Sequence, residues 1–293
     1  MKKISIILMA GILALASCST IEEIPTNDPA VEPAQGEWTI TIPATKDVDT
    51  KALDLEGNTL TAYWSADDEV KVFNGTELIG TLDVTPDSGS KPTTAMLSGT
   101  FSSVSGLSTG STLTLLLPRD VWNYTGQVGT LASIQSKYDY AIATVSIDAL
   151  DTSNNTITTT AASFENQQSI YRFAFRKSSS AFSIKDFKVS SAGNRIVSEM
   201  TLGGTPTLGG LTVTPASATA DPLFVSIRNT GTAEDTYNFI VTGSDDALYD
   251  VSKQIPARVL DVPGKFISAT TMDLTKPSFA PASGTVSTST EVL

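Results

Sequence analysis

The stretch Glu69-Val70-Lys71-Val72-Phe73-Asn74-Gly75 decides the fold class of this chain. Its apolar residues alternate with polar ones, so Val70 and Val72 share one face of an extended strand. Asn74-Gly75 then favours a tight hairpin turn, because both residues tolerate a positive φ. We therefore expect Leu78-Ile79-Gly80-Thr81-Leu82 to form the returning strand of a β-hairpin.

Short runs of the same kind recur on both sides of this hairpin. They are rich in Val, Ile, Thr, Phe and Tyr, and Gly, Asn, Asp, Ser or Pro separates most of them. Beyond the N-terminal segment no apolar stripe has the 3.6-residue period of a helix, so the pattern predicts an all-β protein built from β-sandwiches. The other runs that we expect to form strands are 38–42 (ended by Pro43), 60–64, 94–101, 111–118, 142–150, 156–161, 170–176, 182–189, 195–202, 223–228, 236–241 and 266–274.

The strand expected at 170–176 suggests how these runs divide into domains. Its aromatic residues fall on one face and its arginines on the other, which is typical of a half-buried strand. We place a domain boundary just before it, near 166–169. The sequence thus predicts two β-sandwich domains of transthyretin-like or Greek-key type, at 37–168 and 169–276, followed by a C-terminal tail at 277–293.

The N-terminus has the features of a bacterial lipoprotein signal peptide. Lys2 and Lys3 precede an apolar core at 4–15, which is shorter than the roughly 20 residues that span a bilayer. Ala16-Ser17 then precedes Cys18, the sole cysteine of 293 residues, so this stretch resembles a lipobox. We expect a signal peptide at 1–17, acylation of Cys18 and a polar, Pro-rich linker at 18–36. The alternative is an N-terminal core helix with a buried cysteine.

Composition excludes several classes of function. Loss of the signal peptide leaves 17 basic against 31 acidic residues, a net charge of −14, which disfavours binding to nucleic acid. The chain has no histidine, so histidine-dependent triads and dyads and histidine-liganded zinc are excluded. Catalysis by carboxylates alone is not excluded by this composition. However, the acidic residues are scattered among turn-forming residues, and we expect neither an enzyme nor a cofactor.

Two motifs resemble the fimbrillin-like proteins. That family commonly has a T-K-A element, which Thr50-Lys51-Ala52 matches, followed here by Gly57. It also has a strand with the pattern W-x-x-G-D-x-[IV]-x-[VI]-[FY], which the run from Trp64 to Phe73 resembles, with Asp67 in place of the usual glycine. Near the other end, Val262-Pro263-Gly264-Lys265-Phe266 resembles the start of the family's late strand.

The resemblance implies a lipoprotein of the type V pilus class, exposed on the cell outer membrane and assembled into fimbriae. In that class a surface protease cuts after a basic residue and removes the lipidated segment with the first strand, so another pilus subunit can add a strand in its place. Lys51 is the cleavage site that this implies, Lys46 is a nearby alternative, and 38–42 would be the strand removed. An unprocessed Lys51 in an ordinary loop is the other interpretation.

The possible donor strand is the C-terminal tail. Its residues 283–293 offer only Val286, Val292 and Leu293 as apolar side chains. We therefore favour an accessory, tip or anchor subunit over a main shaft subunit.

Two other groups of residues allow a binding role. Trp122, Tyr124, Tyr138 and Tyr140 flank a Gly-containing connection, where they could bind a glycan or host ligand on an uncleaved surface lipoprotein; packing in the core is the alternative that we favour. The carboxylates of Asp245, Asp246 and Asp250 could ligate calcium, but a solvated turn explains them better, and we expect no metal site.

Overall fold

A computed structural model describes residues 36–46, 54–56, 59–61, 63–118, 121–260, 264, 266–274 and 277–279, which belong to one compact unit that begins at Ala34. Within these residues strands are the predominant regular secondary structure, so the predicted all-β fold class is confirmed. The helices described there are short, α1 (Leu131–Lys137) and α2 (Ala257–Leu260), and neither is long enough to cross a membrane. Thr130 caps α1 by accepting a hydrogen bond from the Ser133 N–H.

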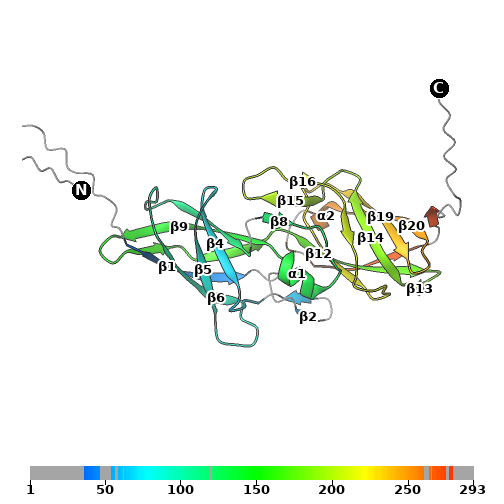
Figure 1. Cartoon of the computed structure of the whole chain (residues 1–293), viewed down its shortest axis with the longest axis horizontal. Coiled ribbons are helices and arrows are strands. Elements are labelled where there is room, and N and C mark those ends of the chain that lie inside the picture. The colour runs from blue at the N-terminus through cyan, green and yellow to red at the C-terminus, as the bar shows by residue number, and fades with distance from the viewer. Residues whose placement is uncertain are drawn as a thin grey trace, which may run out of the picture. The chain divides into compact units, whose positions relative to one another are not determined.

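The largest sheet closes on itself. Its strands follow the order β10-β1-β11-β9-β7-β4-β5-β6, and β1 also pairs with β6, so the two ends of the sheet meet at β1. The predicted sandwich at 37–168 is thus replaced by a barrel-like ring (Figure 1, blue to green). Its strands are β1 (Trp38–Lys46), β4 (Glu69–Asn74), β5 (Glu77–Pro86), β6 (Thr94–Phe101), β7 (Thr112–Leu117), β9 (Ala141–Asp151), β10 (Thr156–Thr159) and β11 (Ala162–Asn166).

The hairpin β4–β5 forms where the sequence predicts it. Asn74 pairs with Glu77 as the last residue of β4, so the turn residues are Gly75 and Thr76 and not the expected Asn74-Gly75. Gly75 has a φ of 61°, the left-handed conformation that glycine adopts at little cost, whereas Asn74 does not adopt a positive φ. Val70 and Val72 point into the ring and are fully buried. A register shift between Val72 and Phe73 turns Phe73 into a second core, which accounts for its burial on the opposite face.

Two further sheets enclose that second core. Phe173 of β12 lies with its ring centroid 5.0 Å from that of Phe239 on β19 and 5.9 Å from that of Phe187 on β14, so side chains of the two sheets interdigitate. One sheet contains β12 (Ser169–Lys177), β13 (Ser180–Ala181), β18 (Leu223–Ile227) and β21 (Phe266–Asp273). The other contains β17 (Leu211–Val213), β14 (Ile184–Ser191), β19 (Asp235–Gly243), β20 (Leu248–Ile255) and β22 (Pro277–Phe279).

The remaining strands form two small sheets. β8 (Val121–Asn123) pairs with β15 (Val197–Thr201), which pairs with β16 (Thr207–Leu208), while β2 (Asp54–Glu56) and β3 (Thr59–Thr61) form a separate hairpin. The second core also includes Leu116, from before the predicted boundary at 166–169. That boundary coincides with the gap between β11 and β12, and the division into two domains stays a prediction.

Candidate functional site: the closing strand

Strand β1 joins the two ends of the ring by pairing along both of its edges. It is antiparallel to β6, from Trp38 opposite Phe101 to Thr45 opposite Thr94. It is parallel to β10 at Thr39 and Ile40 and to β11 from Ala44 to Lys46. An N-terminal strand therefore fills a slot whose walls come from residues far along the chain.

The strand continues past the proline that was expected to end it. Pro43 lacks an N–H and normally disfavours positions inside a sheet. On the parallel side, however, Pro43 lies between the β10 pairing, which stops at Ile40, and the β11 pairing, which starts at Ala44. The N–H that proline lacks is thus not needed for the described parallel pairings, and the strand runs on to Lys46.

Side chains of β1 alternate strictly between core and surface. Trp38, Ile40, Ile42 and Ala44 are each at most 2% exposed and belong to the core of the ring, whereas the residues between them are exposed. Burial of a large apolar side chain contributes about 1.5–3 kcal/mol. The slot thus offers a row of apolar pockets to one face of an extended chain, together with main-chain partners on both edges.

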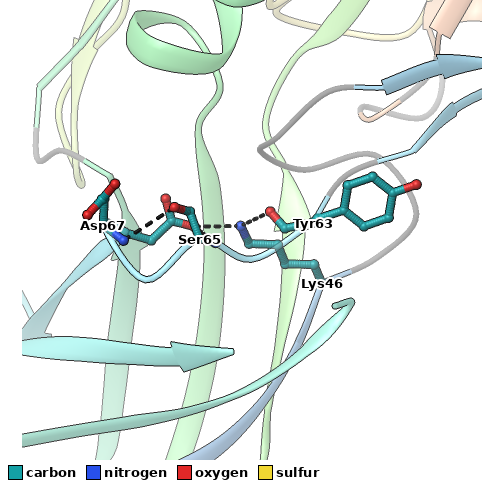
Figure 2. Close-up of polar contacts among 5 residues, drawn as sticks. Lys46, Tyr63, Ser65 and Asp67 are labelled. Carbon is teal, nitrogen blue, oxygen red and sulfur yellow. Dashed lines mark hydrogen bonds and ion pairs between the residues drawn. The ribbon is translucent and has the colours of Figure 1, made fainter. Parts of the chain in front are cut away.

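The last pocket of this row holds a charge. The Lys46 Nζ donates to Asp68 Oδ2 at 3.0 Å and to the Tyr63 carbonyl oxygen at 3.1 Å. It also lies 3.9 Å from the ring centroid of Trp64, a cation–π distance. The side chain of Lys46 is 0% exposed and that of Asp68 is 2% exposed. Figure 2 shows Lys46 directed at the Tyr63 carbonyl.

The turn before β4 builds this pocket. The Asp67 N–H donates to Ser65 Oγ at 3.3 Å (Figure 2). The Ser65 N–H donates to Asp68 Oδ2 at 3.1 Å, so the turn holds the carboxylate in place. Trp64 packs edge-on against Phe164 of β11, with ring centroids 5.4 Å apart. The segment from Trp64 to Asp68, singled out by its motif, therefore supplies the end of the slot.

Three solved structures that match the chain are described as adhesion or fimbrial proteins. A candidate adhesin from Bacteroides ovatus matches with a TM-score of 0.40 and 11% identity, over 82% of this chain and 87% of that one. A candidate cell adhesion protein from Parabacteroides distasonis matches with a TM-score of 0.38 and 9% identity, over 84% and 100%. A fimbrial protein from Bacteroides ovatus matches with a TM-score of 0.33 and 10% identity, over 82% and 50%.

The chain resembles adhesion and fimbrial proteins. These descriptions agree with the resemblance to fimbrillin-like proteins that the sequence motifs indicate. No model of a protein family and no curated protein matches the sequence. Because every one of these TM-scores is below 0.5, no residue's role is transferred from those proteins to this chain.

The two predicted cleavage sites have different outcomes. The side chain of Lys46, the alternative site, is fully buried in the ion pair with Asp68, which disfavours cleavage after it. Lys51 lies outside the described residues, as do Cys18 and the tail 283–293. Acylation of Cys18 and cleavage after Lys51 therefore stay predictions.

The predicted aromatic binding residues lie in the interior. Trp122, Tyr124 and Tyr140 are at most 1% exposed and Tyr138 is 7% exposed. The Tyr124 hydroxyl donates to Gln168 Oε1 at 3.3 Å, and burial raises its pKa above the usual tyrosine value. The hydroxyl of Tyr140 donates to the Asn123 carbonyl at 3.1 Å. With their faces covered, these rings cannot stack on a sugar here, and packing accounts for them.

The three aspartates considered for calcium do not converge on one point. Asp245 pairs with Lys177 at 2.9 Å, Asp246 pairs with Lys185, and Asp250 lies on β20. The described residues contain no cluster of three metal-ligating side chains. Asp245 and Asp246 thus act as partners of lysines on the surface.

This surface arrangement predicts an unusually acidic Asp245. Hydrogen bonds from Lys177 and then from Tyr249 lower the pKa of the Asp245 carboxyl from 3.8 to about 2. A lowered pKa in the folded state stabilises the fold above pH 3.8, and that contribution is lost as the pH falls through about 2. Carbon NMR of the carboxyl should show its midpoint near the lower value, and Lys177→Met should return the midpoint towards 3.8. An unchanged midpoint in Lys177→Met would contradict the assignment.

Proposed function

We propose that the protein is a lipid-anchored, cell-surface fimbrial or adhesion component without catalytic activity, in which β1 is a removable strand. The observation that carries the proposal is the position of β1 in the ring. It pairs on both edges, fills a row of pockets and stands at the N-terminal end of the described chain. Removal of such a strand leaves a slot that another extended segment can occupy by strand addition.

A cut after Lys51 would release β1 without breaking another described strand. β1 ends at Lys46 and β2 begins at Asp54, so Lys51 lies in the connection between them. The fragment from Cys18 to Lys51 would carry both the lipid and the strand. In this proposal the fragment delivers the subunit to the surface and fills the slot until an incoming strand replaces it.

We also propose that the chain has two domains and that the subunit takes an accessory, tip or anchor position in a fibre. The predicted donor segment 283–293 has few apolar side chains for a slot that β1 fills with Trp38, Ile40, Ile42 and Ala44. A subunit whose C-terminal tail is a poor donor strand, but whose slot can accept a strand, suits an accessory, tip or anchor position better than the repeating shaft.

The N-terminus of the surface form tests this proposal. We expect Edman sequencing of the exposed protein to give a chain that starts at Ala52, because Lys46 is buried and Lys51 is the remaining basic residue before β2. Lys51→Gln should abolish this product, while Lys91→Gln, beyond β1, should leave it unchanged. Surface protein that starts only at Cys18, and remains monomeric, would contradict the proposal.

A further inference from the structure

We propose that the pocket around Asp68 selects the incoming strand, and that the strand must place a Lys or Arg where Lys46 now lies. This inference rests on the proposed strand exchange, and it specifies which side chain the incoming strand must carry at this position. The occupant would be an extended segment of another protein chain with a basic residue at the end of its buried face.

The pocket is built for a cation. Among the contacts of the described residues, the Lys46 Nζ lies 3.0 Å from the Asp68 carboxylate, 3.1 Å from the carbonyl oxygen of Tyr63 and 3.9 Å from the ring centroid of Trp64. Each of them favours a positive charge, and none donates a hydrogen bond to the ligand at these contacts. A neutral side chain in this place would leave a carboxylate that is 2% exposed without the cation now beside it.

The position of the pocket makes it a determinant of register. The other pockets of the slot take Trp38, Ile40, Ile42 and Ala44, which are all apolar. Apolar pockets tolerate a strand that slips by two residues, because the same face still points inward. Such a slip in a β1-like strand would move its basic residue away from Asp68, so the charge fixes one register among several that satisfy the apolar pockets.

The inference also specifies the pattern of the partner strand. In the direction of β1, its inward side chains would be aromatic, aliphatic, aliphatic, small and basic at alternate positions. Residues 277–293 of this chain contain no Lys or Arg. The tail of a second copy therefore lacks the required charge, and the donor should be a different subunit.

Peptide exchange into the cleaved chain tests the selection. The full-length protein is nicked with trypsin between β1 and β2, and its resident strand is displaced by fluorescent peptides that correspond to residues 37–46. We expect the wild-type peptide and its Lys46→Arg form to bind, and the Lys46→Met peptide to bind about 30-fold more weakly or worse, as expected for truncation of a buried charge pair. In nicked Asp68→Asn protein this preference should fall below about threefold.

The outcomes separate the inference from the function on which it rests. Equal binding of the Lys46 and Lys46→Met peptides to wild-type protein would overturn the charge selection and leave strand exchange intact. Equally tight binding of a peptide of residues 283–293 would also overturn it. Failure of every peptide to replace the resident strand would contradict strand exchange itself, and with it the inference. If Asp68→Asn does not fold, the comparison of peptides on wild-type protein still decides the matter.

Discussion

Replacement of Lys46 by Met is expected to lower the free energy of unfolding by about 3–5 kcal/mol, because it removes one member of a buried ion pair. The Asp68 carboxylate is 2% exposed and has the Lys46 ammonium at 3.0 Å. Urea denaturation, followed by tryptophan fluorescence, measures the change directly, since Trp64 lies against the ammonium. Lys253→Met, at an exposed position of β20, is the matched control and should change stability by less than about 0.5 kcal/mol.

A double substitution separates the charge from the shape of the side chain. Lys46→Met combined with Asp68→Leu removes both charges, and we expect it to recover much of the stability lost in Lys46→Met, because buried ion pairs contribute little net stability over apolar replacements. A Lys46→Met protein as stable as wild type would contradict the buried pair. Equal losses in the single and double variants would mean that side-chain shape, and not charge, matters there.

Truncation of Ile42 to Ala should destabilise the protein by about 2–5 kcal/mol, the usual cost of removing a fully buried aliphatic side chain. Ile42 is 0% exposed in the middle of β1, where its side chain fills the centre of the slot. The neighbouring substitution Thr41→Ala changes an exposed residue of the same strand and should cost less than about 1 kcal/mol. Equal effects of the two would contradict the alternation that makes β1 a pocket-filling strand.

Local features of the fold could be predicted because neighbours in sequence produce them. The alternation at Val70 and Val72, followed by turn-forming residues, was sufficient to locate the β4–β5 hairpin, although the turn lies at Gly75-Thr76, one position later than expected. The first strand could be located from Trp38, Ile40 and Ile42 in the same way. Helix α1 escaped prediction because, of its seven residues, only Ile134 is buried, which is too little for a helical period to show.

Non-local features could not be predicted in this way. Closure of the ring depends on the pairings of β1 with β6, β10 and β11. The register partners nearest in sequence, Thr45 and Thr94, are already 94 − 45 = 49 positions apart. The Lys46–Asp68 pair spans 22 residues and joins a strand end to a turn. Lys46 falls on the inward-facing positions of β1 if the alternation from Trp38 is continued beyond Pro43. This alternation was the sequence feature that could have predicted a buried lysine.

In the proposed assembly, β1 must leave its slot, and a disulfide that locks β1 in place tests this requirement. Thr39 and Thr100 are exposed register partners on β1 and β6, so Thr39→Cys with Thr100→Cys should join the strand to the wall of the slot. On cells we expect wild type and each single variant to form SDS-resistant polymers. The oxidised double variant should stay monomeric and regain assembly on reduction. Polymers that form equally well with the disulfide intact would contradict the claim.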